Sequence, residues 1–454
     1  MSAPANDTLL KTLYNALPES AQGGVDVSAI HVNRSPDDEH DPVATLRRYI
    51  QWQPDYDSLG LPGANYLFSG LRGVGKTTEL NRLITELRSD GIAAYYCDVS
   101  RYLNLNDPQV RLSDLLMAAL AGLADAVRAE LGRDTLSESI WQRVARLLGS
   151  EVQLKPTVEV ALPSGAVSIE ASLRDNPSFR QRLAEFAQQS SDFYREAEAF
   201  AREVTRLIRE RTGCHTIVLV VDSLERLSAP SGEESTLFDS LKQIFFNDPA
   251  RLRLPGLSLV YSAPPYLHAI LPGVNGGFTQ CLSLPNFKVI ERPSPGARDP
   301  VHHAPGIARM VEIVERRFAR WREVLAPPVL EHLACLSGGN VRRYFALIRT
   351  LAMKAALAGT ALPISTLDAE PLRAAIAEAG LPLQWLTARD RHWLGLFMDG
   401  SNTPASHIED LATDLPSIIR LFDHSLVLDY RNGESWYQVP ALVRQWIVEP
   451  HDPD

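Results

Sequence analysis

Residues 66–77 read YLFSGLRGVGKT, and this stretch decides the fold. Its last eight residues fill the pattern GxxxxGK[ST], with an apolar run before them and a helical pattern over 79–87 after them. Glycines at this spacing let successive backbone N–H groups face phosphate oxygens, the lysine neutralises phosphate charge, and a threonine hydroxyl can hold Mg²⁺. The stretch therefore predicts a phosphate-binding loop (P-loop) for ATP or ADP with Mg²⁺. The expected ligands are Gly70, Gly73, Val74, Gly75, Lys76, Thr77 and Thr78, and Lys76 also serves catalysis.

Short apolar runs alternate with helical patterns on both sides of this loop. They occupy 66–69, 93–99, 216–221, 257–262 and 281–289. Because such alternation is typical of a parallel sheet flanked by helices, we expect an α/β fold of the P-loop NTPase class. About 110 residues separate the second run from the third, far more than a crossover needs. We expect an insertion at about 125–212, with a hairpin over 152–173 and a long helix over 186–207 that either packs within its own domain or offers a coiled-coil surface.

The third run ends in a carboxylate and is the second candidate for site chemistry. Residues 216–222 read TIVLVVD, the pattern in which a buried strand brings an aspartate beside a P-loop. Asp222, together with Thr77, is therefore expected to hold Mg²⁺. Glu225 is expected to polarise the attacking water. Its alternatives are an exposed acid in the first turn of a helix and an ion-pair partner of Arg226.

Charge and composition limit the classes of partner. The chain has 454 residues, and 45 Lys and Arg against 55 Asp and Glu give a net charge of −10. This balance argues against attraction of the whole protein to nucleic acid or to an anionic membrane. The four cysteines form no CxxC pair and no zinc-like or disulfide-like spacing. With no stretch of 18 apolar residues and no signal-peptide pattern, we expect a cytoplasmic protein that is neither exported nor membrane-spanning.

The C-terminal part predicts two further domains of opposite charge. Residues 305–380 read as a helical lid, and 305–360 carry nine Arg and Lys against four Glu, a local net charge of +5. Three helices at 387–399, 404–411 and 416–424, followed by strands at 426–430 and 436–439 around Asn432-Gly433, predict a winged helix. Residues 381–454 hold five Arg and eleven acidic residues, so we expect this domain to pack against a protein partner rather than read DNA. The basic lid leaves room for contact with nucleic acid.

Together these patterns divide the chain into five segments. We expect an N-terminal segment at 1–29, a P-loop core at 30–291, a linker at 292–304, the helical lid at 305–380 and the winged helix at 383–450.

The order of these features resembles the AAA+ ATPases of the origin-recognition type and the related STAND signalling ATPases. The string DSLER at 222–226 is also similar to the acidic string of KAP-type P-loop ATPases, which likewise carry a large insertion. The resemblance implies that Ser262 is the sensor-1 residue and that Val32 and Arg34 lie near the adenine. In the lid motif GGNVRR at 338–343, Arg342 would be the sensor-2 arginine or, alternatively, an ordinary surface cation.

Two departures from these families bear on the activity. Residues 254–287, where AAA+ rings carry an arginine finger, contain neither Arg nor Lys, and Ala263-Pro264-Pro265 follow Ser262 where STAND proteins often have Arg. We therefore expect slow ATP hydrolysis unless one of four cations substitutes: Arg226, Arg251, Arg253 or Arg292. Slow turnover favours a regulatory switch acting on a protein partner or on self-assembly, in a bacterial signalling or defence context by analogy. The alternatives are an ATP-dependent DNA loader or initiator-like ATPase, and a scaffold that holds nucleotide without turnover.

Overall fold

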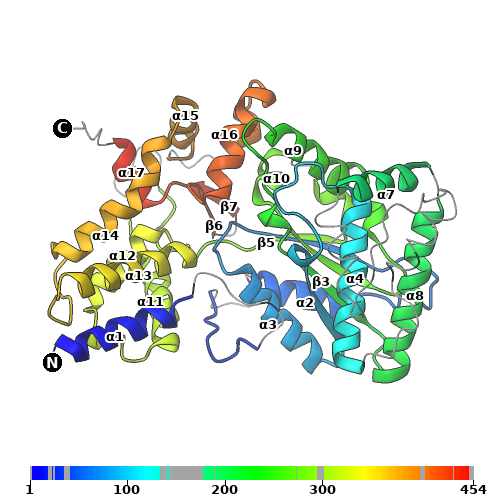
Figure 1. Ribbon diagram of the computed structural model, residues 1–454, viewed down its shortest axis with the longest axis horizontal. Helices are drawn as coiled ribbons and strands as arrows, with labels where there is room; N and C mark the ends of the chain where they lie inside the picture. The colour runs from blue at the N-terminus through cyan, green and yellow to red at the C-terminus, as the bar shows by residue number, and fades with distance from the viewer. Residues whose placement is uncertain are drawn as a thin grey trace, which may run out of the picture. The chain divides into compact units, whose positions relative to one another are not determined.

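The computed structural model describes residues 3–18, 23, 26–34, 41–132, 140, 143, 177–189, 191–271, 274–293, 301–398, 404–432 and 434–448. The chain forms two compact units (Figure 1). The sheet unit comprises Leu46–Ser69 and Leu83–Leu282, and the helical unit comprises Met1–Thr45, Gly70–Arg82 and Ser283–Asp454. The P-loop is thus grouped with the C-terminal half of the chain. The hairpin expected over 152–173 lies outside the described residues.

A five-stranded sheet forms the centre of the sheet unit. Its strands are β1 (Asn65–Ser69), β2 (Ala93–Asp98), β3 (Ile217–Asp222), β4 (Ser258–Ala263) and β5 (Gln280–Ser283), in the order β2-β3-β4-β1-β5. The pairs β2–β3, β3–β4 and β4–β1 are parallel. Every residue of β1, β3 and β4 is buried, which explains why their sequences are continuous apolar runs. The predicted α/β class is confirmed, although the fifth run forms a strand only over its first residues.

Within its described residues, the inserted region contributes two helices over 177–212, where the sequence predicted one at 186–207. These are α7 (Pro177–Gln189) and α8 (Asp192–Thr212), with Ser191 between them in a turn. Both pack on α4 (Leu112–Leu131). The apolar face of α8 is buried, including Phe193, Phe200 and Val204. The heptad-like spacing therefore reflects packing within the sheet unit. The described part of this unit also contains the helices α9 (Glu234–Lys242) and α10 (Pro265–Ile270), and shorter helical segments at Gln243–Asn247, Pro249–Leu252 and Val274–Gly277.

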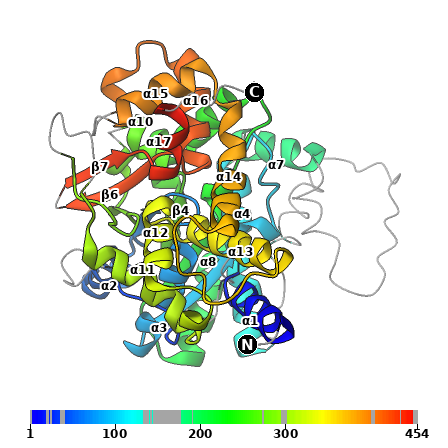
Figure 2. The same cartoon turned by 90° about the vertical axis from the view of Figure 1, so that its left-hand side faces the viewer.

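A helical domain forms the core of the helical unit. It consists of α11 (Ala304–Arg317), α12 (Pro327–Ser337), α13 (Val341–Leu357) and α14 (Glu370–Gly380). The N-terminal helix α1 (Ala3–Ala16) packs along α13 (Figures 1 and 2). Leu10 and Leu13 of α1 share one apolar core with Trp321 and Tyr344. The start of the chain is therefore part of this domain's core.

The C-terminal segment contains two of the three expected helices and the expected hairpin, with shifted bounds. It comprises α15 (Ala388–Met398), α16 (Leu411–Asp423), the antiparallel strands β6 (Leu428–Asn432) and β7 (Glu434–Gln438), and α17 (Ala441–Val448). The helix predicted over 404–411 is only a 3₁₀ turn, Pro404–His407. Helix α16 begins before its predicted start because Asp410 caps it through Ala412, which leaves Pro416 inside the helix.

No helix in the described part of the chain has both the length and the apolar character needed to cross a membrane.

Candidate nucleotide-binding site

The P-loop has the backbone conformation that its glycines predict. Gly73 and Gly75 have φ values of +77° and +101°, a region that favours glycine. Gly73 also has no room for a side chain, because a Cβ there would lie 2.4 Å from the Cβ of Arg342. Helix α3 (Lys76–Ser89) starts at the lysine, so Thr77 and Thr78 lie in its first turn. This places a helix N-terminus, which favours anions, directly after the loop.

Lys76 is held inside the loop. Its side chain is buried, and Nζ donates hydrogen bonds to the carbonyls of Gly70 at 2.7 Å and Leu71 at 3.0 Å. These two carbonyls keep the ammonium within the curve of the loop. An oxyanion arriving there would meet a charge that is already oriented.

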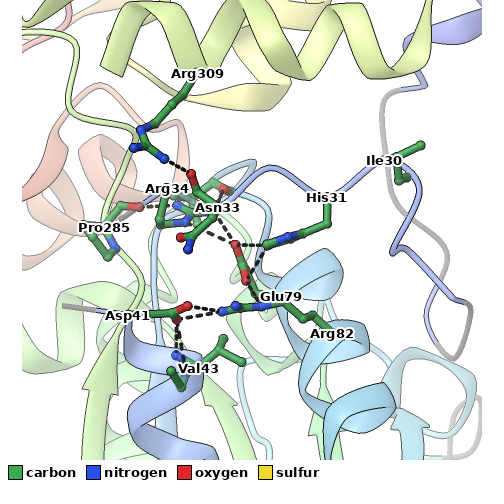
Figure 3. A network of polar contacts seen from close by, with 12 residues as sticks. Ile30, His31, Asn33, Arg34, Asp41, Val43, Glu79, Arg82, Pro285 and Arg309 are labelled. Atoms are coloured by element: carbon green, nitrogen blue, oxygen red, sulfur yellow. Dashed lines mark hydrogen bonds and ion pairs between the residues drawn. The ribbon is translucent and has the colours of Figure 1, made fainter. Parts of the chain in front are cut away.

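A short segment that we call the strap, Ile30–Arg34, is fastened to α3 through its side chains (Figure 3). His31 Nε2 lies 3.3 and 3.2 Å from the two carboxylate oxygens of Glu79. Arg34 Nε and Nη2 donate to Glu79 Oε1 at 3.3 and 3.2 Å, and Nη2 also donates to the carbonyl of Val74 at 3.1 Å. The strap is therefore joined both to the P-loop and to the first turn of the helix that follows it.

Glu79 is the centre of this buried cluster. Arg82 lies 2.9 Å from Glu79 and donates to both oxygens of Asp41 at 2.6 Å, and Asp41 in turn caps the start of α2 (Pro42–Trp52). Burial alone would raise the pKa of Glu79, but the hydrogen bond from His31 and the charges of Arg34 and Arg82 outweigh it and lower the pKa to about 2. Burial lowers the pKa of Arg34, and Glu79 opposes that shift. The carboxylate thus stays ionised and compensates the buried cations.

The backbone of the strap is held from the opposite side by α11. Arg309 Nη1 donates to the carbonyl of Asn33, Arg316 Nη1 to that of His31 at 2.6 Å, and Arg317 Nη1 to that of Ile30 at 3.1 Å (Figure 3 shows the first). These arginines carry part of the positive charge that the sequence assigned to a basic lid. The strap consequently links the P-loop helix to the helical domain.

The strap residues expected near the adenine do lie beside the P-loop. Val32 and Arg34 line a small cavity of about 30 Å³ together with Val74, Gly75 and Thr78. Phe287 closes another wall, with its ring centroid 4.5 Å from the guanidinium carbon of Arg34. A hydrophobic side chain, an aromatic ring and an arginine plane are groups on which a nucleobase can pack.

The far side of the P-loop is bound by the helical domain and by the turn between α16 and β6. Asn340 Nδ2 and Ser425 Oγ donate to the carbonyl of Arg72 at 2.8 and 2.9 Å. The backbone N–H of Arg342 donates to the carbonyl of Gly73 at 3.0 Å, while the Arg342 side chain is exposed. Asn340 also caps α13 through the N–H of Arg343. One asparagine of the GGNVRR motif therefore ties the start of α13 to the P-loop.

The acidic residues expected in catalysis belong to the sheet unit. Asp222 is fully buried at the end of β3, where Tyr96 donates a hydrogen bond to Oδ2 at 2.8 Å. Burial and then the charge of Asp222 raise the pKa of Tyr96, so the phenol remains a proton donor. Glu225 lies in the turn Leu224–Arg226 and is only 7% exposed. The alternative interpretation of Glu225 as an exposed acid in the first turn of a helix is therefore wrong.

Ser262 fastens the ends of two neighbouring strands. It is buried near the end of β4, and its hydroxyl accepts a hydrogen bond from the N–H of Leu224 at 3.0 Å. That bond fixes the turn which carries Glu225. Ser223 in the same turn has φ of +78°, a strained value for a residue with a side chain. Ser262 thus holds the chain directly after Asp222.

Sequence reasoning missed several side chains that contribute to the surroundings of the P-loop or of the acidic residues in the sheet unit. Glu79 contacts the predicted residue Arg34, Tyr96 contacts the predicted residue Asp222, and His31 contacts Glu79. Glu79 had a local signal, since an acid in the first turn of α3 faces the helix N-terminus, but that position alone does not identify its partners. Its contacts come from 45 and 48 residues earlier in the chain.

Comparison with known proteins finds likeness in structure only. No protein-family model and no curated protein sequence matches the chain. One similar solved structure is that of the Aeropyrum pernix ORC2 protein in ADPNP-ADP complexes. It is 14% identical in sequence, the match covers 92% of this chain and 97% of that chain, and the TM-score is 0.35. Cdc6p of Pyrobaculum aerophilum is 15% identical over 93% and 98%, with a TM-score of 0.36. The RuvB Holliday junction branch migration motor of Thermotoga maritima is 13% identical over 92% and 99%, with a TM-score of 0.32.

Proposed function

We propose that this chain is an ATP-binding regulatory switch of the AAA+ or STAND kind that hydrolyses ATP slowly and controls a protein partner or its own assembly. One observation carries the proposal. The carbonyls of Arg72 and Gly73 in the P-loop are held by Asn340, by the backbone of Arg342 and by Ser425. Any change in the loop on gain or loss of phosphate therefore bears on the helical domain and on the turn that leads into the wing.

The P-loop fits a nucleoside phosphate. Its glycines adopt positive φ, its lysine is oriented by the loop carbonyls, and a helix N-terminus follows. Mg²⁺ suits the oxygen donors Thr77 and Asp222, since this ion is usually held by one or two protein oxygens together with substrate phosphates. No group of three or more His, Cys, Asp or Glu side chains in the described residues forms a metal site of its own. In this scheme Lys76 neutralises phosphate charge, Arg342 senses the phosphate from the lid, and Glu225 orients the attacking water.

The charges of the C-terminal domain favour a protein partner over DNA. Arg389 pairs with Asp414, and Arg420 lies 2.8 Å from Asp390; both carboxylates are fully buried. Trp393 donates a second hydrogen bond to Asp414 at 3.0 Å. Arg420 is the only cation of α16, the helix that would read DNA in this architecture. Because it is engaged inside its own domain, it is poorly placed to contact phosphates.

The helical domain also uses much of its positive charge internally. Three arginines of α11 hold the strap, and Arg349 donates to the hydroxyl of Tyr14 in α1 at 2.7 Å. Lys354 lies 2.6 Å from Glu378. The net charge of +5 in this region is therefore a weaker argument for DNA than the sequence alone indicates. A DNA-associated, initiator-like ATPase is the alternative function, and a nucleotide-locked scaffold is the third.

The experiment compares the full-length protein with its Lys76→Ala and Asp222→Asn variants. We expect Lys76→Ala to abolish ATP binding, and Asp222→Asn to retain binding but lose turnover, because the first removes phosphate neutralisation and the second a metal ligand. Isothermal titration with ATP and steady-state phosphate release measure the two properties. Turnover by the wild type at tens per second would contradict the slow switch, and no turnover at all would favour the scaffold.

A second measurement separates the switch from the DNA-associated alternative. We expect no binding of duplex DNA at low salt in the presence of ATP, measured by fluorescence anisotropy. Binding that weakens steeply with salt would favour the initiator-like function.

A further inference from the structure

A second cavity in the helical unit shares Arg342 and the contacts around Arg72 with the function proposed above, but that function leaves the cavity itself without a ligand. It measures about 480 Å³ and lies between α13, α14 and the turn after α16. This volume falls within the range of small-molecule sites. Aliphatic side chains form part of its lining, which we call the aliphatic floor, among them Ala346, Leu347 and Leu442. Its polar wall contains arginines from two distant parts of the sequence.

The charges around this cavity favour an anion. Arg72, Arg342 and Arg343 line it, against the acids Glu378 and Asp423. Lys354, outside the lining, lies 2.6 Å from Glu378 and offsets it, while Asp423 lies 3.9 Å from Arg72. The positive charges therefore outnumber the negative ones. His424, also in the lining, has its pKa lowered by burial and then by Arg72 and Arg420, which fits a positive local potential.

Arg343 supplies a donor that the described residues leave unsatisfied. Its Nη2 donates to the carbonyls of His424 at 3.2 Å and Ser425 at 2.8 Å. Its Nη1 is buried and makes no hydrogen bond to any described residue. Burial lowers the pKa of Arg343 to about 10, so the group still carries its charge at neutral pH. A buried charged donor without an acceptor is costly, and an anionic ligand would satisfy it.

This cavity is separate from the phosphate side of the P-loop. It shares no lining residue with the small cavity beside Val32, which is walled by Val74, Gly75 and Thr78. The P-loop contributes only Arg72 to it, a residue whose carbonyl is bound by Asn340 and Ser425 of the same wall. The cavity therefore adjoins the carbonyl side of the loop tip, whereas nucleotide phosphates bind to backbone N–H groups.

We propose that this cavity is a binding site for a small phosphorylated molecule, held by Arg72, Arg342 and Arg343 with its non-phosphorylated part on the aliphatic floor. Guanidinium groups pair well with phosphate oxygens because their donors match them in geometry. A volume of about 480 Å³ matches a free small molecule, which is why we propose one rather than a phosphorylated segment of another protein. The bound molecule bridges α13 and the turn before the wing.

The test uses the full-length Lys76→Ala variant, so that the P-loop does not bind the probe, and inorganic pyrophosphate as that probe. Isothermal titration at low salt should show saturable binding. Adding Ala346→Trp, which fills the cavity from an exposed position on α13, should weaken binding at least about tenfold, an effect of about 1.4 kcal/mol. Adding Ala358→Trp, at an exposed position that does not line the cavity, should leave binding unchanged and serves as the matched control.

A charge variant keeps the proposal testable if the tryptophan disturbs folding. Arg342→Gln in the same background replaces an exposed side chain, and it should weaken pyrophosphate binding and reduce its dependence on salt. Failure of Lys76→Ala to bind pyrophosphate overturns the proposal, as does binding that neither Ala346→Trp nor Arg342→Gln alters. Neither result bears on ATP binding by the wild type, so the proposed function stands or falls separately.

Discussion

At the scale of single residues, the most consequential side chain is Glu79, which the sequence did not mark as part of a site. It is 3% exposed and lies against three potential cations: His31, Arg34 and Arg82. Once these cations are buried, they need a carboxylate beside them, because without it their positive charge would be left uncompensated inside the protein. Glu79 therefore positions the strap beside the P-loop without itself being placed on the nucleotide.

Replacing Glu79 tests this role. Glu79→Gln should lower the free energy of unfolding by about 3 kcal/mol and weaken ATP binding, since it leaves buried arginines unpaired and frees the strap. Glu86→Gln is the matched control, because Glu86 lies on the same helix and pairs with Arg47 at a more exposed position. Urea unfolding and ATP titration measure both effects. Equal stability of the two variants would contradict the positioning role.

The low pKa of Glu79 predicts an acid-dependent loss of stability. Its folded pKa of about 2 lies below the ordinary value of 4.5, so the stabilisation is complete above pH 4.5 and is lost as the pH falls toward 2. The shift corresponds to stability on the order of 3 kcal/mol. Urea unfolding of the wild type and Glu79→Gln at several pH values should show their difference shrinking across this window. A difference in unfolding free energy that stays constant across this pH range would contradict the lowered pKa of Glu79.

At the scale of elements, the strap connects α3 to α11 through hydrogen bonds. The strap has side chains on α3 and backbone carbonyls on α11, so two helices far apart in sequence hold the same five residues. The positive charge of α11 can be predicted from the sequence, but the groups that it binds cannot, because a hydrogen bond from an arginine to a backbone carbonyl leaves no mark in the sequence of the acceptor.

Removing the arginine contacts should free the strap. The double variant Arg309→Gln and Arg316→Gln should increase cleavage of the chain within 30–34 by a nonspecific protease and weaken ATP binding severalfold. The double variant Arg320→Gln and Arg322→Gln removes two exposed ion pairs, with Glu323 and Glu315, and should change neither property. Limited proteolysis followed by mass analysis reports the strap directly. Equal cleavage in the two double variants would refute the connection.

At the scale of the whole molecule, the P-loop belongs structurally to the unit that also contains the chain's C-terminal domain. Ser425 joins the two, and it adopts φ of +53°, which costs backbone strain in a residue other than glycine. Strain of this kind persists only where surrounding contacts maintain it. The bond from Ser425 to the P-loop carbonyl of Arg72 is one of these contacts.

Ser425→Gly removes the hydroxyl while accepting the positive φ. We expect release of ADP to become about fivefold faster, because one hydrogen bond of about 1 kcal/mol no longer restrains the P-loop. Ser425→Ala should release ADP equally fast but be less stable, since it loses the bond and keeps the strain. Stopped-flow release of a fluorescent ADP and thermal unfolding separate the two effects. Wild-type release by both variants would show that the turn does not restrain the loop.

The sequence by itself determined the features that depend on local backbone chemistry or on full burial. The P-loop follows from glycine positions, the central strands from continuous apolar runs, and the C-terminal hairpin from alternating residues around Asn432-Gly433. Helix bounds were predicted less accurately. The sequence pattern placed the start of α16 at Pro416, but Asp410 caps the helix earlier in the chain, so Pro416 lies inside it.

Only the tertiary structure decided which residues surround the P-loop. Glu79 meets Arg34 across 45 residues, and Asn340 and Ser425 reach Arg72 across 268 and 353. The tertiary structure also determines what the arginines of the helical and C-terminal domains bind. Arginines that contribute to the basic charge in the sequence are bound to backbone carbonyls and buried acids. The physical reason is that long-range polar contacts depend on where the chain returns in space, and local sequence pattern carries no record of that return.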